Sequence, residues 1–237
     1  MAKKGKVHKF QDQESEERPV RFRRYQYLFL IVCEDENTEP LYFKNFKEQI
    51  PNETIYLRPV GTGRDAKGVV EEAIKERHKL AIEAKKEVDV VWAVFDKDDA
   101  DENATKIQRF NDAFDIAEKN KIKAAYSNEV FELWLLLHLT DVDSTVPLPR
   151  KIIYDLLQTH IQQKGNYSTF QYKHGNGDIL TIIHEIGNQQ KAIERAKTLL
   201  QKHKTKKPIQ ANPSTKVHLL VKELLEWITY FSYKPDK

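Results

Sequence analysis

The sequence has few cysteines and methionines and lacks the long apolar segments that identify secreted or membrane proteins. Its 237 residues include one methionine and one cysteine, Cys33. A single cysteine excludes an internal disulfide and is typical of proteins from a reducing cytosol. The first twenty residues contain no apolar signal-peptide segment, and no run approaches the eighteen apolar residues of a membrane span. We therefore expect a cytoplasmic protein without a membrane partner.

Motifs for two common binding sites are also missing. No Walker A pattern occurs, which argues against a self-contained P-loop ATPase. The acidic stretch that starts at Asp96 does not match a calcium-binding EF-hand loop, because Asp101 stands where the loop needs glycine. Ile107 stands where the loop needs its closing glutamate. The acids must therefore be explained in another way.

Charge is abundant but nearly balanced, with 39 basic and 36 acidic residues and a net charge of +3. Its local segregation is more informative than this total. Basic residues crowd the N-terminal 24 residues and the run Lys202–Lys207, whereas five acids crowd residues 96–102. The lysine run can follow a nucleic-acid backbone in a salt-dependent manner, although such runs are usually solvated faces.

Apolar strand patterns and amphipathic helix patterns alternate through the first 145 residues. This alternation predicts an α/β fold with a parallel sheet flanked by helices. Beyond residue 145 the periodicity is helical. We expect a flexible tail (1–22), an α/β core (23–145) and a helical C-terminal region (146–237) packed on the core. Strands are expected at 25–34, 53–60, 88–96 and 122–127, and helices at 37–50, 66–86, 104–120, 129–140, 146–164, 188–204 and 214–231.

Carboxylates stand where the first and third predicted strands end. Glu34 closes the first strand, and Asp96 and Asp98 close the third. Sites in parallel sheets form outside the carboxyl ends of strands, so neighbouring strands would bring the three together. Their mutual repulsion favours a divalent cation, and oxygen ligands select Mg²⁺ or Mn²⁺.

The spacing of the two aspartates supports the same interpretation. Side chains two apart on an extended segment point the same way, so Asp96 and Asp98 would reach one ion or two neighbouring ions. Such ions stabilise the attacking and leaving oxygens of a phosphoryl displacement. The ordinary alternative is that acids after a strand are solvated turn residues, which is our interpretation of Asp99, Asp101 and Glu102.

Three further segments carry candidate residues, each with an ordinary alternative. The turn at 61–68 can approach a phosphate with Arg64 or Lys67, or be a plain turn. His138 can position substrate or transfer a proton, although a satisfied core histidine is favoured two to one. The segment 170–178, which contains Lys173, is equally compatible with two roles, a nucleic-acid-binding loop or a plain connector.

Four motifs together resemble the RloB-like family, whose members include AbiLii-type abortive-infection proteins. They are CEDENTEPLYF, VFDKDD, SNEVFELWLLLHL and NPSTKVHLLV, and the likeness covers roughly residues 26–225. The resemblance implies a Toprim-like, Rossmann-like domain with the activity of a metal-dependent nucleic-acid endonuclease. It also implies a role in antiphage defence with an RloA-type ATPase partner.

The resemblance assigns roles to particular residues. It makes Glu34 a metal ligand or general acid/base and Asp96 with Asp98 the metal-binding pair. It adds Glu39 as a metal ligand, and it allows a second ion near the fourth strand. The residues implied for that ion and for substrate support are Ser127, Glu132 and Asn212. The chain departs from the family pattern at Asp35, Glu36 and Glu129, where relatives carry glycine or proline.

Two other functions are compatible with the sequence. A phosphohydrolase of the haloacid-dehalogenase kind would use the first aspartate of the pair as a nucleophile, but its pattern belongs on the first strand. A non-catalytic Toprim module would bind nucleic acid or the ATPase without cleavage. The sequence leaves open a DNA, RNA or tRNA substrate, one or two ions, and a homo-oligomer.

Overall fold

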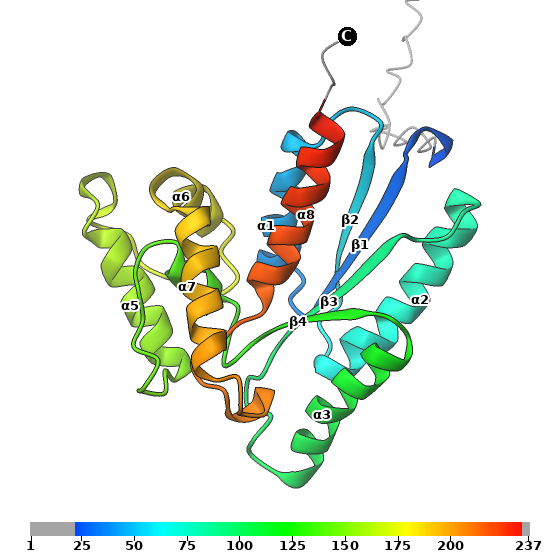
Figure 1. Ribbon diagram of the computed structural model, residues 1–237. Coiled ribbons are helices and arrows are strands. Elements are labelled where there is room, and N and C mark those ends of the chain that lie inside the picture. The colour runs from blue at the N-terminus through cyan, green and yellow to red at the C-terminus, as the bar shows by residue number, and fades with distance from the viewer. Residues whose placement is uncertain (1–21, 234–237) are drawn as a thin grey trace, which may run out of the picture.

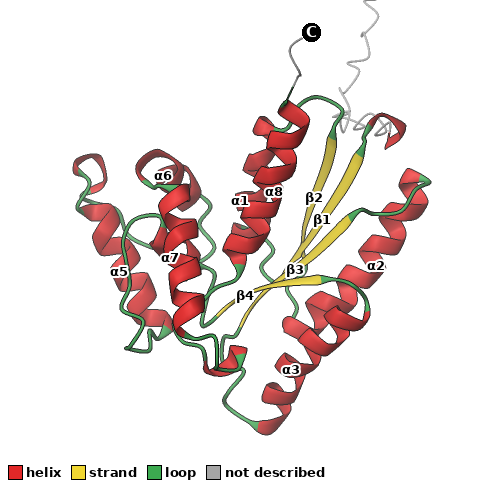
Figure 2. Ribbon diagram, viewed as in Figure 1, coloured by secondary structure: helices red, strands yellow, loops and turns green. Residues whose placement is uncertain are grey.

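The computed structural model describes residues 22–233, and its centre is one sheet of four parallel strands (Figures 1 and 2). The order across the sheet is β2-β1-β3-β4. The predicted α/β class is therefore confirmed. The predicted tail lies outside the described residues except for Phe22. The strands are β1 (Tyr27–Cys33), β2 (Ile55–Gly61), β3 (Val90–Asp96) and β4 (Lys123–Ser127).

Helices follow each strand and fill the C-terminal region. All the expected helices occur, but the one expected at 129–140 is shorter, and the one expected at 37–50 is α-helical only to Lys44 and continues as a 3₁₀ turn. A helix at 178–186 was not expected, because the glycines and asparagines on either side of it are typical of a connector. The helices are α1 (Thr38–Lys44), α2 (Ala66–Ala84), α3 (Ala104–Lys119), α4 (Glu132–Leu137), α5 (Arg150–Gln162), α6 (Asp178–Ile186), α7 (Gln189–Lys202) and α8 (Val217–Ser232). Short 3₁₀ turns are η1 (Phe22–Arg24), η2 (Asn45–Gln49), η3 (Gly165–Tyr167) and η4 (Pro208–Gln210).

Hydrophobic side chains alternate between two cores, one on each face of the sheet. Leu28 and Leu30 of β1 pack with α2 and α3 on one face, and Phe29 and Ile31 pack on the other. That second core continues from α1, α4 and α8 into α5, α6 and α7 (Figure 1). The C-terminal helices therefore share a hydrophobic core with the sheet. Within residues 22–233, no helix has both the length and the apolar character of a bilayer span.

The register of the sheet fixes which residues meet at its carboxyl edge. Cys33 at the end of β1 pairs with Gly61 of β2 on one side and Val94 of β3 on the other. Asp96, the last residue of β3, pairs with Ser127 of β4. Because β1 and β3 are direct neighbours, the predicted convergence of their ends is confirmed.

Candidate active site

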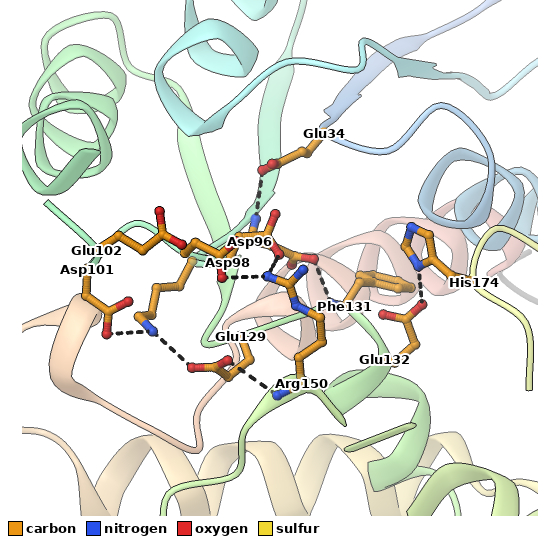
Figure 3. Close-up of polar contacts among 12 residues, drawn as sticks. Glu34, Asp96, Asp98, Asp101, Glu102, Glu129, Phe131, Glu132, Arg150 and His174 are labelled. Carbon is orange, nitrogen blue, oxygen red and sulfur yellow. Dashed lines mark hydrogen bonds and ion pairs between the residues drawn. The ribbon is translucent and has the colours of Figure 1, made fainter. Parts of the chain in front are cut away.

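Glu34 and Asp96 are joined at the carboxyl edge of the sheet (Figure 3). The backbone N–H of Asp96 donates to Glu34 Oε2 at 3.0 Å. The other side of Asp96 is fixed by Phe131, whose N–H donates to Asp96 Oδ2 at 2.9 Å. Backbone pairing of β1 with β3 thus places two carboxyl groups from distant parts of the sequence in one crevice.

Asp98 reaches the same crevice by a route that differs from the predicted one. Strand β3 ends at Asp96, and Asp98 has φ of +45°, so the segment between them is not extended. The inference that the two side chains share a strand face is therefore wrong. Asp98 is held instead by its N–H, which donates to Glu129 O at 3.0 Å, and by Arg150 Nη2 at 2.9 Å from Oδ1.

Glu39 is a buried acid on the first turn of α1, and its side chain is folded back towards β1. Its residue exposure is 1%, and Glu39 Oε2 accepts from the N–H of Asp35 at 3.2 Å. Asp35 Oδ2 accepts from the N–H of Thr38 at 2.6 Å. Asn37 is the N-cap residue of α1 but makes no side-chain cap bond, so Asp35 satisfies the first N–H of the helix instead.

Burial and mutual repulsion raise the pKa of these acids. For Glu34, burial raises the pKa to about 8 against the opposing hydrogen bond from Asp96 N–H, and the charge of Asp98 adds to the rise. The pKa of Asp96 is raised well above its usual value by burial and then by Glu39 and Glu34. For Glu39, burial and then Glu34 raise the pKa in the same direction. Burial also raises the pKa of Asp98, with Arg150 opposing the rise. The carboxyl groups therefore form one interacting cluster.

The chemistry of this cluster fits a hard divalent cation. Asp96 Oδ1 and Glu39 Oε1 are buried and have no hydrogen-bond partner among the described residues. Buried carboxylate oxygens without donors are the groups that an ion would satisfy. No three His, Cys, Asp or Glu side chains in residues 22–233 already stand in metal-ligating positions.

Two cations at the crevice were not predicted from the sequence. Arg150, at the start of α5, bridges Asp98 at 2.9 Å and Asp99 at 3.2 Å. Lys97 is buried, and its Nζ lies 2.9 Å from Glu129 and 3.0 Å from Asp101. Burial lowers the pKa of Lys97, but its two carboxylate partners outweigh that effect and raise it. These cations partly neutralise the loop that carries Asp98.

Residues of the C-terminal region contact the side chain of Glu132. It is 4% exposed on the first turn of α4 and accepts a short hydrogen bond from the hydroxyl of Tyr172. His174 Nδ1 lies 3.7 Å from Glu132 Oε1 (Figure 3). The segment 170–178 therefore lies beside the acidic cluster. From the sequence, a simple connector was equally compatible with this segment.

The remaining candidates on the sheet edge and in α4 have structural partners. The hydroxyl of Ser127 lies 3.1 Å from that of Thr215. His138 is buried, its Nδ1 lies 3.0 Å from Trp134 O, and burial lowers its pKa to about 4. Asn212 Nδ2 donates to Glu129 Oε1 at 3.1 Å, which links the 211–215 segment to the loop that holds Asp98. His138 is therefore a buried, hydrogen-bonded histidine of the core, which is the alternative that the sequence favoured.

The two exposed cationic candidates lie outside this set of contacts. Arg64 forms a long ion pair of 3.6 Å with Glu72 and is half-exposed. Lys67, its neighbour in the turn, is paired with Asp112 at 2.9 Å. Lys173 is exposed in the loop between η3 and α6. Their predicted roles towards a phosphate or substrate stay predictions.

A cavity of about 200 Å³ opens beside the carboxyl ends of β1 and β3. Glu34, Asp96 and Asp98 line one side of it, and the starts of α2 and α3 line the other. Arg109 of α3 forms a two-bond ion pair with Asp65, the N-cap of α2, at 2.5 and 2.7 Å. The cavity therefore has carboxylates from the ends of β1 and β3 and the paired cations Lys106 and Arg109 from α3 in its lining.

Two glycines allow the β2–α2 loop to pack against the segment that follows Glu34. A Cβ on Gly61 would lie 2.5 Å from the Cα of Glu36 and 2.6 Å from the carbonyl oxygen of Asp35. Gly63 has φ of +61°, and its N–H donates to Glu34 O at 2.8 Å. These glycines allow the loop to pack against the backbone that follows Glu34, and the predicted phosphate contact of the turn stays a prediction.

Gly61→Ala is expected to destabilise the protein by about 1–3 kcal/mol, because backbone atoms must move to admit the methyl group. Urea unfolding followed by circular dichroism measures this loss. Gly165→Ala is the matched control, since no atom lies within 4 Å of its added Cβ. Equal stabilities of the two variants would contradict the close-packing argument.

Comparisons with known proteins give one match. A family model described as RloB-like protein matches residues 29–224, which include every carboxylate of the cluster and the C-terminal helices as far as α8. Searches of curated proteins and of solved structures each found no match.

Proposed function

The chain belongs to the RloB-like protein family, and on that premise we propose that it is a divalent-metal-dependent nuclease that hydrolyses phosphodiester bonds. The observation that carries the proposal is the buried carboxyl cluster. Asp96 and Glu39 each present an oxygen without a partner in the described residues, beside Glu34. Maintaining such a cluster is costly unless a cation occupies it.

The residues have separable tasks in this proposal. Asp96 and Asp98, with Glu34 and Glu39, would hold Mg²⁺ or Mn²⁺, and Glu132 would serve a second ion. The ion would orient a water molecule and neutralise charge on the phosphate. Glu34 would be a ligand of this ion or, if it stays unligated, the group that accepts and returns a proton; burial raises its pKa to about 8 in the metal-free protein. Arg150 is placed to contact a phosphate oxygen.

The biological setting is also a proposal, and it rests on family resemblance. We propose that the protein is the effector of an antiphage or abortive-infection system and that an RloA-type ATPase gates it. The catalytic part would be a Toprim-like domain. Nucleic acid, either DNA or RNA including tRNA, would be the substrate.

Metal-dependent cleavage is the direct test. The purified protein is incubated with single- and double-stranded DNA, RNA and tRNA, with Mg²⁺, Mn²⁺ or EDTA, alone and with the ATPase. Glu34→Gln is expected to lower the rate about 10²–10⁴-fold, the usual contribution of a positioned acid or base. The amide can still accept the hydrogen bond from Asp96 N–H, so the fold should be kept.

Glu226→Gln is the matched control, because this glutamate is 65% exposed on α8. It should cleave at the wild-type rate. Cleavage that persists in EDTA, or an unchanged rate in Glu34→Gln, would contradict the proposal. Metal binding measured by calorimetry without cleavage of any substrate would instead favour a non-catalytic module. A covalent aspartyl-phosphate on Asp96 would favour a haloacid-dehalogenase-like phosphohydrolase.

A further inference from the structure

An aromatic stack stands next to the acidic cluster. The rings of Tyr154 and Tyr172 are stacked, with centroids 4.6 Å apart and planes 28° apart. The ring of His174 extends the group, 6.3 Å from Tyr154. The two tyrosines are half-buried, whereas the His174 side chain is 70% exposed. The stack therefore ends at a ring that is open to solvent.

Several contacts fix this stack in place. Gln158 of α5 accepts a hydrogen bond from the N–H of Tyr172 at 2.9 Å, and Gln162 donates to Phe170 O at 2.7 Å. The hydroxyl of Tyr172 donates to Glu132. The loop is thus fastened to α5 on one side and to the acidic cluster on the other, which gives the rings a defined distance from the carboxylates.

A cation lies on the same side of α5. Arg150 precedes Tyr154 by four residues, which is about one helical turn, so both side chains project from one face. Arg150 contacts Asp98 and Asp99, and Tyr154 contacts Tyr172 and His174. A guanidinium that contacts Asp98 and a group of rings that contacts Glu132 therefore lie next to each other at the acidic cluster.

Core packing alone accounts for only part of this arrangement. Tyr154 and Tyr172 do pack against the hydrophobic core. A role in the hydrophobic core does not explain why the ring of His174 is exposed to solvent. It also does not explain why the hydroxyl of Tyr172 donates a hydrogen bond to the buried carboxylate of Glu132. Open ring faces beside cations are the features that bind unpaired bases while the cation meets the backbone.

We propose that Tyr154, Tyr172 and His174 form a subsite for an unpaired base, so that the nuclease acts on single-stranded nucleic acid or on an unpaired loop. The reason is geometric, because bases within a duplex are stacked on one another and offer only their edges. The proposal rests on the proposed function and names the substrate class of that same site. Arg150 would hold the phosphate next to the stacked base.

Binding without cleavage tests the proposal. Fluorescence anisotropy in EDTA compares a labelled single-stranded oligonucleotide with the duplex of the same sequence, as DNA and as RNA. Tighter binding of the single strand, by about tenfold or more, is expected. His174→Ala is expected to weaken single-strand binding about 5- to 100-fold, which is the range for loss of one stacked base.

Three further variants separate stacking from other causes. His174→Phe keeps a ring and removes the charge, so it should bind the single strand like the wild type. Tyr154→Leu should weaken binding as His174→Ala does, provided circular dichroism shows a native fold. Tyr230→Leu is the matched control, because this tyrosine is 67% exposed on α8, and it should bind normally.

The results distinguish this proposal from the proposed function. Equal affinity for single strand and duplex, unchanged binding by His174→Ala, or a His174→Phe variant as weak as His174→Ala would each overturn the stacking subsite, even if metal-dependent cleavage is observed. Ring-dependent single-strand binding without any metal-dependent cleavage would support the subsite and overturn the nuclease assignment.

Discussion

Asp96→Asn is expected to abolish metal-dependent cleavage and to raise the melting temperature of the metal-free protein. Asp96 carries an unpartnered buried oxygen within a cluster of acids that raise its pKa well above the usual value. The amide keeps an oxygen for the N–H of Phe131 but removes the ligand charge. Loss of one well-placed charge-stabilising group costs about 10²–10³ in rate, and loss of a metal ligand should cost at least as much.

The stabilising part of this prediction follows from the same repulsion. Removal of a carboxyl group whose charge is disfavoured by burial and by its acidic neighbours should increase the free energy of unfolding of the metal-free protein at pH 8. Differential scanning calorimetry and a cleavage assay measure the two effects. Glu102→Gln, which alters an acid that is 56% exposed, should change neither. A less stable Asp96→Asn variant, or one that still cleaves, would contradict the assignment.

Without divalent metal, the free energy of unfolding is expected to fall as the pH rises from about 6.5 to 8. Glu34 has a usual pKa of 4.5, and burial in the fold raises it to about 8. Between these values the folded protein keeps a proton that the unfolded chain has released. Raising the pH therefore favours unfolding, by up to about 1.4 kcal/mol per pH unit for each such group.

Other groups that titrate in the same range determine the pH interval in which this fall in stability is best measured. Glu39 and Asp96 shift in the same direction as Glu34. Burial lowers the pKa of His138 and His218 from 6.5 to about 4, so their contribution to stability grows as the pH rises from 4 to 6.5. That opposite contribution fades only about one pH unit above 6.5. His174, whose pKa is raised by its contact with Glu132, adds to the fall caused by the acids above pH 6.5.

Mn²⁺ or Mg²⁺ should cancel much of this fall, because the ion competes with the protons for the same oxygens. Urea unfolding at pH 5, 6.5 and 8, with and without Mn²⁺, measures the effect. Stabilisation by the metal should be small at pH 5 and largest at pH 8. Glu34→Gln should have a shallower pH dependence in EDTA. Metal stabilisation of equal size at all three pH values would contradict the model of shared ligands.

The part of the site that lies on the sheet could be predicted from the sequence, for a physical reason. The apolar runs before Glu34 and Asp96 identify buried parallel strands, and the carboxyl ends of neighbouring parallel strands lie at one edge. The route of Asp98 could not be predicted in this way, because its left-handed backbone depends on a hydrogen bond to Glu129 in a distant loop.

The residues that the C-terminal region contributes to the site also could not be predicted from local sequence patterns. Arg150 follows a proline at the start of an ordinary amphipathic helix, and nothing in that helix indicates the aspartates it contacts. Tyr172 belongs to a polar, glycine-containing segment that is equally typical of a connector. Contacts between residues forty or more positions apart depend on how the helices pack, which periodicity does not encode.

Helix α8 lies along one face of the sheet, where Trp227 packs on Tyr27 with ring centroids 4.1 Å apart and Glu223 accepts from Trp92 Nε1 at 2.8 Å. Genetic recombination that joined residues 1–145 to an unrelated partner sequence would leave that face bare. It would also remove the guanidinium that balances Asp98. Residues 1–145 and the C-terminal helices should therefore be inherited as one unit.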